Sequence, residues 1–481
     1  MAARRPRIAF LSYSSAAFDA RTARMARSAV QAGFDVVVYA RLQDGLPPVE
    51  QREGYRVLRA PWRWWLAFPG LRSLSRGRSK RRAAGRGTGT SGSTGSAGRG
   101  QGGAQPGSGL PGATPLDASV VRAANPDLRS RISKTVRSRF LQLAGPFGFT
   151  LRTILMFPIK PMGWSHGLEG VVEPADIWHG MWAGSLPSLL RYQRRLGGRT
   201  IYDSRDVYME SRSFARSSRP MRALLARIER RWAHRVDRVL TVNEAYADLI
   251  AAQLRVPRPP IVMNCPERWT VPVPPPDRIR HALGLPPETA IALYQGQLIT
   301  DRGIEEAMEA ILDVPGAVLA LLGFGPLQAT LEERVRTPRY AGQVFVLPAV
   351  GPDELLLWTA SADVSVMAIA PTSINHRFTT PQKLFESLAA GVPVVASDLP
   401  GMAEIVTPSG AGVLCDPLSP ASIAAAIRSI VDAPPDERAA LRARALAAAH
   451  ERYNWEAQVD TLFGLYQDLL ARPPRRPAAR S

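Results

Sequence analysis

The sequence predicts an α/β protein with two doubly wound, Rossmann-like domains that face each other across a cleft. Two series of short apolar runs alternate with helical stretches, and this alternation is typical of parallel sheets. A proline-rich stretch at 271–276 separates the two series, and 481 residues exceed what one core usually serves. We therefore expect an N-terminal domain over 1–270 and a C-terminal domain over 277–450. A helix over 451–471 is expected to return to the first domain, ahead of a basic tail over 472–481.

The first domain opens with a strand–helix–strand pattern. Apolar runs at 8–11 and 35–40 flank a helical stretch at 21–32, which ends at Gly33. Further strands are predicted at 176–178, 200–202 and 239–242, and further helices at 224–234 and 244–254.

Six further apolar runs predict the sheet of the second domain, at 291–294, 318–322, 344–347, 364–369, 392–396 and 413–415. Thr380 is expected to cap a helix whose first residue is Pro381. The free N–H groups and the positive dipole end of such a helix attract a phosphate. Lys383 adds a full charge, and Glu386 lies about one turn further along the helix. These residues predict a basic, nucleotide-sized site.

The net charge of +20 is concentrated in two segments. The stretch 54–116 holds eleven Lys and Arg and no acid, and the tail adds four arginines. Residues 71–118 are rich in Gly, Ser and Arg and are expected to form a disordered insert in the N-terminal domain, because they cannot bury enough apolar surface to fold. A basic amphipathic helix is predicted at 128–143. The surplus positive charge of these segments therefore gives information about binding partners and not about the fold.

The segments that flank this insert suggest a membrane surface as a partner. Trp62, Trp64, Trp65 and Phe68 suit the lipid–water interface, and the helix at 128–143 pairs an apolar stripe with basic residues. We expect peripheral attachment to an anionic inner membrane face, with packing of both flanks onto the first domain as the alternative. A nucleic-acid partner is not expected, because the insert lacks interleaved aromatic residues.

The rest of the composition points to the cytoplasm. Cys265 and Cys415 are too far apart in sequence for a CxxC motif and indicate neither a disulfide framework nor a zinc site. No signal peptide and no transmembrane helix are expected, because no apolar run is long enough.

Glycine-rich turns follow the predicted strands of the second domain. Gly296 and Gly303 would let a ligand approach the backbone, and Arg302 between them could bind a phosphate in a bidentate manner. Gly323 and Gly325 end the next strand, where ligands of open sheets bind. A plain strand–helix turn is the alternative for each of these segments.

The first domain offers fewer candidates. His179 follows the predicted strand at 176–178 and is a catalytic candidate by this position, although a single histidine is more often structural. The carboxylates of 203–206 follow another strand and could face the cleft, but a buried cap or turn role fits them better. His234, inside a charged helix, is interpreted as structural.

Taken together, these motifs resemble those of the family 4 glycosyltransferases, which are retaining enzymes with the two-domain GT-B fold. The resemblance rests on 380–406, 294–307 and 237–242 in this order, and it covers about 6–60 and 170–470. It implies that Glu386 receives the ribose hydroxyls of a nucleotide-sugar donor. Arg302 takes the place of the family's pyrophosphate-binding lysine. Lys383 and the start of its helix would also help to bind the diphosphate. The remaining donor-side candidates are Gly296, Gly303, Gly323, Gly325, Val350, Asn375 and Thr380.

Three positions depart from the family pattern. Phe378 stands where the family commonly has the first of two glutamates, and Asn375 or His376 could replace that contact to the donor sugar. Gln297 replaces an arginine after the glycine of the phosphate loop, and Met181 replaces the second histidine of a His-x-His pair. Arg302, Lys383 and Glu386 remain, as in a divergent subgroup.

The resemblance implies a retaining, hexosyltransferase-like glycosyltransferase without a cofactor, a metal ion or a protein nucleophile. Its partners would be a nucleotide-sugar donor and a glycan or lipid-linked acceptor of the cell envelope or of polysaccharide biosynthesis. Two alternatives remain open. One is a sugar-nucleotide epimerase of the same architecture, which would need groups that transfer protons. The other is a non-catalytic nucleotide-sugar-binding partner subunit, an alternative that the loss at Phe378 keeps open.

Overall fold

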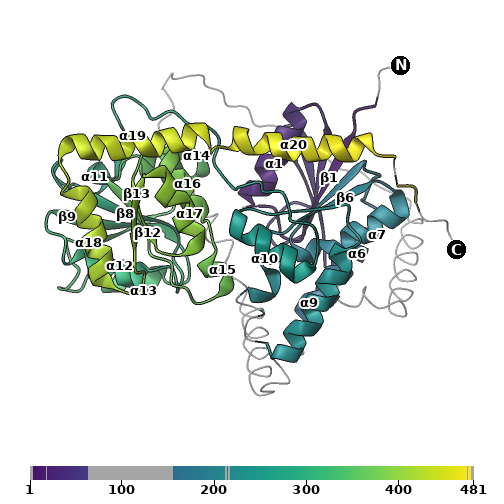
Figure 1. Cartoon of the computed structure of the whole chain (residues 1–481), viewed down its shortest axis with the longest axis horizontal. Coiled ribbons are helices and arrows are strands. Elements are labelled where there is room, and N and C mark those ends of the chain that lie inside the picture. Colours follow the sequence, from purple (N-terminus) through teal and green to yellow (C-terminus); the bar gives the residue numbers. More distant parts are fainter. Residues whose placement is uncertain are drawn as a thin grey trace, which may run out of the picture.

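The structure, a computed structural model, describes residues 4–17, 19–62, 155–211, 214, 217–473 and 475–477. Two α/β domains lie side by side along the long axis of the molecule, and both chain ends lie at the first domain (Figure 1). This confirms the predicted pair of doubly wound domains. The expected insert at 71–118, the helix at 128–143, and Trp64, Trp65 and Phe68 lie outside the described residues.

The first domain contains a seven-stranded sheet with the order β3-β4-β2-β1-β5-β6-β7. Its strands are β1 (Arg7–Ser12), β2 (Asp35–Arg41), β3 (Val49–Arg52), β4 (Tyr55–Ala60), β5 (Ile177–Met181), β6 (Arg199–Asp203) and β7 (Arg238–Leu240). All neighbours pair in parallel except β3 and β4, which form an antiparallel pair at the edge. The apolar pattern of the sequence does not reveal this edge pair, because arginines and glutamates interrupt it.

The side chains of β1 alternate between two cores, as the pleat of a strand requires. Ile8 and Phe10 face the core formed with α1 (Ala20–Gln31), whereas Ala9 and Leu11 face the opposite core. The other helices of this domain are α6 (Lys160–Gly167), α7 (Leu186–Leu196), α9 (Arg219–Ala233) and α10 (Glu244–Leu254). The domain is therefore a three-layer sandwich with its sheet in the middle.

The second domain repeats this plan with a six-stranded, wholly parallel sheet of order β10-β9-β8-β11-β12-β13. Its strands are β8 (Ala290–Gln297), β9 (Ala317–Phe324), β10 (Val344–Pro348), β11 (Val364–Met367), β12 (Val394–Ser397) and β13 (Gly412–Cys415). Its helices are α11 (Arg278–Leu283), α12 (Ile304–Ile311), α13 (Gln328–Arg334), α14 (Pro352–Thr359), α15 (Ile374–Arg377), α16 (Gln382–Ala389), α17 (Pro400–Ser409), α18 (Pro420–Val431) and α19 (Pro435–Glu451). All six strands predicted for this domain are present.

The last helix, α20 (Trp455–Ala471), leaves the second domain and packs on the first (Figure 1). Trp455, Leu462, Tyr466 and Leu469 are fully buried in the same core as α1 and β1. The side chain of Asn454 caps α20 by accepting a hydrogen bond from the N–H of Ala457, at 2.9 Å. The chain thus passes between the domains twice, first through the proline-rich linker and then before α20.

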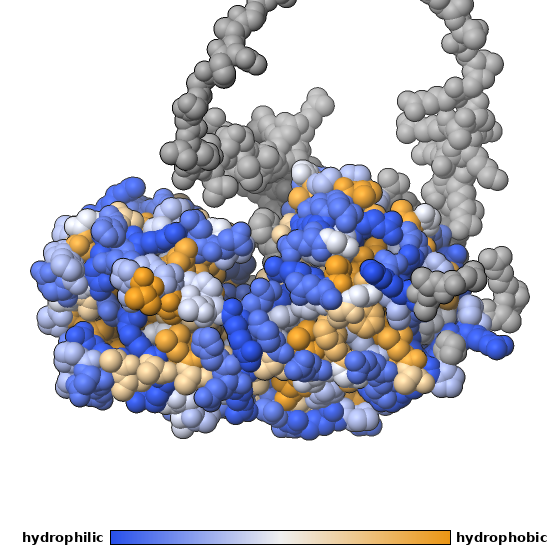
Figure 2. All heavy atoms as spheres, turned by 90° about the horizontal axis from the view of Figure 1, so that it is seen from above, coloured by the Kyte–Doolittle hydropathy of each residue, from blue (hydrophilic) through white to orange (hydrophobic). Residues whose placement is uncertain are grey.

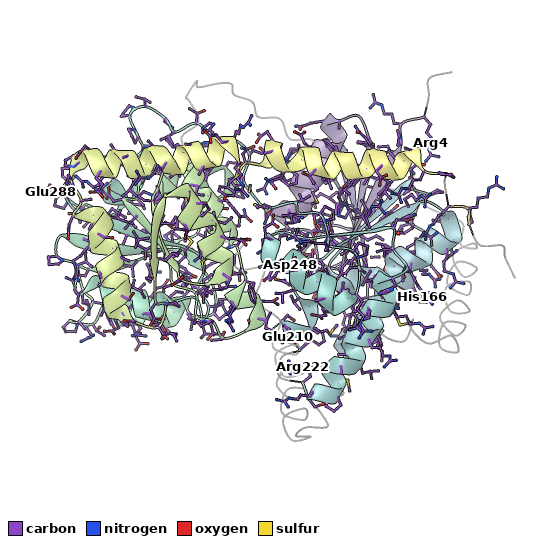
Figure 3. The ribbon with its side chains drawn as sticks, in the orientation of Figure 1. Arg4, His166, Glu210, Arg222, Asp248 and Glu288 are labelled. Carbon is purple, nitrogen blue, oxygen red and sulfur yellow. The ribbon has the colours of Figure 1, made fainter. Side chains whose placement is uncertain are left out.

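The face of the molecule seen in Figure 2 carries many hydrophilic residues. Seen from above, hydrophobic residues form small groups among hydrophilic ones on both domains (Figure 2). Arg222 on α9 pairs with Glu210 at 3.2 Å, and Asp248 on α10 pairs with Arg258 at 2.7 Å; Figure 3 labels Arg222, Glu210 and Asp248. None of the helices that the structure describes has the length and apolar character needed to cross a membrane.

Candidate functional site

The order of the second sheet reverses between β8 and β11, and ligands of doubly wound sheets bind at such a point, beyond the carboxyl ends of the strands. Tight backbone packing at this edge explains two of its glycines. A Cβ at Gly323 would lie 1.9 Å from the carbonyl oxygen of Gly296. A Cβ at Gly303 would lie 1.9 Å from the carbonyl oxygen of Ala368. Gly325 has a φ of +158° and lies against the backbone of Leu298. The predicted glycine loops therefore meet at one edge of the sheet.

Lys383 lies in the first turn of α16, and its Nζ lies 3.7 Å from the ring centroid of Tyr294 on β8. This Nζ is buried and makes no hydrogen bond to the described residues. Burial in the first place, and then the charge of Arg302, lower the pKa of Lys383 to about 7, while Glu386 acts in the opposite direction. A buried amine without an anionic partner is costly unless a ligand supplies one.

Arg302 lies in the loop between β8 and α12 and is partly exposed. It makes no hydrogen bond or ion pair that involves the described part of the chain, but it lies near enough to act on Lys383 and on Asp206 of the first domain. Two cations, Arg302 and Lys383, are thus placed together without a carboxylate that pairs with either directly. The prediction that they converge with the start of α16 agrees with this geometry.

Glu386, the third predicted residue, is buried one turn further along α16. Its two oxygens accept hydrogen bonds from Gln295 and Gln382, both at 2.8 Å. Burial raises the pKa of Glu386, and these two hydrogen bonds oppose the rise. The carboxylate keeps free lone pairs, so a pair of ligand hydroxyls can still donate to it.

The partners of Glu386 belong to a longer chain of hydrogen bonds that the sequence analysis did not anticipate. Arg24 of α1 donates to Asn264 at 3.0 Å, and Asn264 donates to Gln382 at 3.1 Å. At the other end, Thr359 donates to the Oε1 of Gln295 at 2.7 Å. This relay, formed by Arg24, Asn264, Gln382, Glu386, Gln295 and Thr359, connects the first domain to the carboxylate. The only indication of this relay in the sequence is the polar end of the β8 segment, which is otherwise apolar.

The prediction that Thr380 caps α16 is wrong. Pro381 occupies the cap position and no side chain caps the helix. Thr380 instead accepts a hydrogen bond from Asn243 of the first domain at 3.2 Å, and the same amide of Asn243 donates to the carbonyl of Phe378 at 2.7 Å. Asn243 caps α10 with its oxygen, so its nitrogen is free to reach the second domain.

Asn375 belongs to the same contact between the domains. Its side-chain amide exchanges hydrogen bonds with the backbone N–H and C=O of Val207, at 3.0 and 3.2 Å. A contact from Asn375 to a donor sugar would require this pair of bonds to break. Phe378 packs against the apolar cluster of the first domain, which explains a hydrophobic residue at this position. Val350 is partly buried beside the cluster under β8 and β9, and His376 bonds to Thr372 at 2.9 Å.

The position predicted for His179 is also wrong, because β5 extends to Met181 and His179 lies inside it. The ring is fully buried, stacks on Phe10 and bonds through Nδ1 to the hydroxyl of Tyr466 at 2.8 Å. Burial lowers the pKa of His179 to about 4. The imidazole is therefore neutral and out of contact with solvent in this arrangement.

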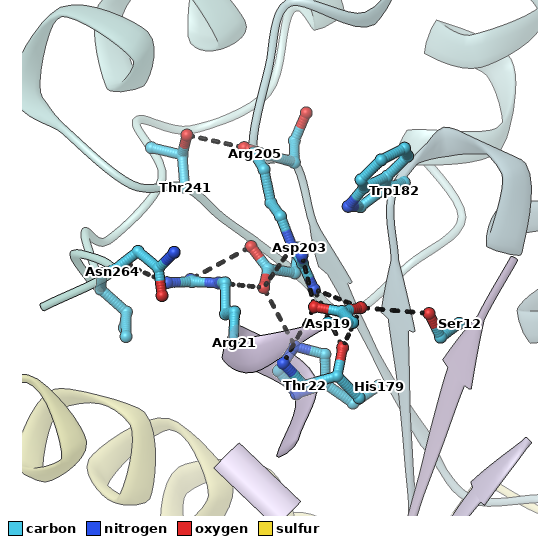
Figure 4. Close-up of polar contacts among 12 residues, drawn as sticks. Ser12, Asp19, Arg21, Thr22, His179, Trp182, Asp203, Arg205, Thr241 and Asn264 are labelled. Carbon is cyan, nitrogen blue, oxygen red and sulfur yellow. Dashed lines mark hydrogen bonds and ion pairs between the residues drawn. The ribbon is translucent and has the colours of Figure 1, made fainter. Parts of the chain in front are cut away.

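Beside His179, the first domain carries a set of charged side chains that pair with one another (Figure 4). Arg21 forms a bidentate ion pair with Asp203, at 2.8 and 3.2 Å, and both side chains are almost completely buried. Arg205 pairs with Asp19 at 2.9 Å, and the opposing effects of burial and this guanidinium leave the pKa of Asp19 below its usual value. The cap or turn role expected for the carboxylates of 203–206 does not hold for Asp203, which lies within β6 and pairs with Arg21.

No set of three His, Cys, Asp or Glu side chains in the described ranges is arranged to hold a metal ion. Gln297 and Met181, the two other departures noted in the sequence, lie at the exposed end of β8 and in the core of the first domain.

Two family models match the chain. The model described as glycosyl transferases group 1 matches residues 276–447, and the model described as glycosyl transferase 4-like domain matches residues 110–267. Together they span most of the chain and divide it where the structure does.

Similar proteins include the D-inositol 3-phosphate glycosyltransferase of Acidothermus cellulolyticus, 32% identical over 216 residues, which are 42% of this chain and 46% of that protein. The glycogen synthase of Mycobacterium tuberculosis is 29% identical over 195 residues, or 39% of this chain and 44% of that protein. The chain thus matches slightly less than half the length of these relatives. Sucrose-phosphate synthase from Thermosynechococcus elongatus has the same fold, with a TM-score of 0.63 and 16% identity over 97% of this chain and 100% of that one.

Proposed function

The chain belongs to the group 1 glycosyltransferases of the GT-B type, and we propose that it transfers a sugar from a nucleotide-sugar donor to a glycan or lipid-linked acceptor with retention of anomeric configuration. The donor would bind at the carboxyl edge of the second sheet. The acceptor would bind at the facing edge of the first domain.

The observation that supports this proposal most is the buried, unbonded Nζ of Lys383. The start of α16 and the charge of Arg302 lie around it, so the site combines a helix N-terminus with two cations. A diphosphate would supply the missing hydrogen-bond partner and would return the pKa of Lys383 toward its usual value. Glu386, one turn away, would then accept the ribose hydroxyls.

These residues suit the departure of a nucleoside diphosphate. As the bond to the sugar breaks, negative charge grows on the β-phosphate, and fixed positive groups stabilise this charge more than they stabilise the ground state. Arg302, Lys383 and the N–H groups of α16 would fill this role without a metal ion, because two full positive charges offset the diphosphate. The side chains of the site provide no nucleophile in our proposal, and the acceptor hydroxyl would attack from the face that the leaving group vacates.

The proposal is tested by screening nucleotide sugars for thermal stabilisation of the full chain. A ligand at 100 times its dissociation constant should add about 2.7 kcal/mol to the unfolding free energy. The best ligand is then incubated with methyl glycosides, and the anomeric configuration of any product is read by proton NMR. Product with the configuration of the donor is expected.

Two controls make this test decisive. Lys383→Met should lose the stabilisation by the ligand, whereas Arg339→Gln, at an exposed site of the second domain, should keep it. Incubation without an acceptor distinguishes transfer from epimerisation, because an epimerase would convert the donor alone. Failure of all nucleotide sugars to stabilise the protein would contradict the proposal.

A further inference from the structure

Trp182 lies at a position in the first sheet that corresponds to the donor site in the second. The order of the first sheet reverses between β1 and β5, which is again the point where ligands of doubly wound sheets bind. Trp182 directly follows β5, and 44% of its surface is exposed to solvent. It is the only tryptophan among the large hydrophobic side chains that are exposed in the described part of the chain.

The backbone of Trp182 holds the indole in this position at a cost. Its φ of 69° and ψ of 161° lie outside the regions that bulky residues adopt, and such strain costs about 1–3 kcal/mol. Three hydrogen bonds maintain the conformation. Trp182 N–H donates to the carbonyl of Asp203 at 3.0 Å, and the carbonyl of Trp182 accepts from the N–H of Ser185 at 3.0 Å and from its hydroxyl at 2.7 Å. A strained backbone that exposes a large aromatic ring is typical of a binding site rather than of a fold element.

A fixed cation borders the same space. The guanidinium carbon of Arg205 lies 5.7 Å from the centroid of the indole ring of Trp182 (Figure 4). Asp19 and the hydroxyl of Thr22, at 3.0 Å, hold this guanidinium, yet its Nε is buried without a hydrogen-bond partner. This Nε lies 3.9 Å from the Asp203 carboxylate and is out of reach of a ligand, but 16% of the Arg205 side chain is exposed.

This side of the first domain is the side that meets the donor site. Burial raises the pKa of the Asp206 carboxyl group, and the charges of Arg205 and Arg302 oppose this rise. Asp206 is therefore close enough to Arg302 to interact with its charge. Val207 bonds to Asn375 of the second domain. A ligand on Trp182 would thus lie at the margin of the contact between the two domains.

We propose that Trp182 is the stacking platform of the acceptor site and that the acceptor presents a pyranose ring there, with Arg205 donating a hydrogen bond to one of its hydroxyls. The inference rests on the proposed function. One face of a pyranose carries C–H groups and packs on an aromatic ring, while hydroxyls at its rim need polar partners. An indole beside a fixed guanidinium meets both requirements. An extended lipid chain has no polar group that could bind the guanidinium.

The experiment measures binding of methyl α-glucopyranoside, methyl α-mannopyranoside and myo-inositol to the full chain by saturation-transfer NMR. Wild-type protein should transfer saturation mainly to the C–H protons of one ring face. Trp182→Ala should weaken binding about tenfold, since it removes most of the apolar contact, and Trp182→Phe should restore most of it. Leu418→Ala, a change at a similarly exposed side chain of the second domain, should have no effect.

Thermal stabilisation by the nucleotide sugar is measured on the same variants, so that the two proposals fail separately. Pyranoside binding that is equal in wild type and Trp182→Ala overturns the platform, as does a lack of pyranoside binding by the wild type. Binding that depends on Trp182 in a protein that no nucleotide sugar stabilises would overturn the proposed function and leave the platform standing.

Discussion

The two domains carry charges at facing edges of their sheets, but they arrange these charges in opposite ways. In the first domain two buried arginines pair with carboxylates: Arg21 with Asp203, and Arg205 with Asp19. In the second domain the Nζ of Lys383 is buried without a partner, beside the charge of Arg302. Paired charges fix a shape, whereas unpaired charges of one sign are maintained at a cost that a ligand of opposite sign can offset.

The largest effect is expected from breaking a pair in the first domain. Asp203→Ala would leave the charge of Arg21 in a site that is 1% exposed, and it should lower the unfolding free energy by about 3–5 kcal/mol. Denaturant unfolding measures this loss. Glu354→Ala breaks an exposed pair with Arg278 and should cost less than about 1 kcal/mol, so a similar loss in both variants would contradict the contrast.

The second domain should respond in the opposite sense. Lys383→Met removes an unpaired buried charge and keeps the length of the side chain, so the unfolding free energy should stay equal or rise. Lys383→Met should lose about 2–4 kcal/mol of transition-state stabilisation, so its kcat/KM should fall roughly 30- to 1,000-fold. Arg302→Gln should lose a similar amount of transition-state stabilisation. Arg339→Gln should retain the wild-type rate. A marked loss of stability in Lys383→Met would show that the amine has a structural partner.

The pH dependence sharpens the same contrast, because the pKa of Lys383 is lowered to about 7. Between this value and the pKa of about 10.4 in the unfolded chain, the unfolded state binds more protons, so the contribution of Lys383 makes stability rise with pH across this window. A bound diphosphate favours the ammonium form, so binding at pH 8 should take up a proton. Calorimetry in buffers of different ionisation enthalpy should detect uptake in the wild type, and equal uptake by Lys383→Met would assign it to another group.

The smallest effect is expected from the relay that connects the domains. Gln382→Ala removes one hydrogen bond to Glu386 and the connection to Asn264 and Arg24, and it should weaken donor binding by about 1 kcal/mol, or roughly fivefold. Titration of the nucleotide sugar measures this change. Gln253→Ala, at a partly buried position of α10, is the control. Unchanged affinity in Gln382→Ala would show that Glu386 does not depend on the relay for its position.

The sequence predicted the second domain well because its strands are uninterrupted apolar runs that local pattern suffices to identify. Lys383 and Glu386 were expected to act together because they occupy consecutive turns of one helix, and Arg302 because a glycine loop surrounds it. These inferences depend on neighbours in sequence, and the structure places the three residues together at one edge.

The errors concern residues whose partners are distant in sequence. His179 and Gly180 interrupt an apolar run, so the strand was ended too early; a hydroxyl 287 positions further along satisfies the buried ring. Thr380 suits a helix cap by local rules, but Asn243 of the other domain bonds to it instead. The conformation of Trp182 depends on the hydrogen bond from its N–H to the carbonyl of Asp203 on β6, which no local pattern encodes.

The return of α20 to the first domain has a consequence for how the protein is made. A ribosome releases the first sheet long before it releases Trp455, Leu462, Tyr466 and Leu469, which complete the core on one of its faces. Domains usually fold in the order in which they emerge during synthesis. Here the second domain can close its own cores while the first still lacks a cover, so we expect the N-terminal half to complete its folding last and to depend on chaperones in the interval.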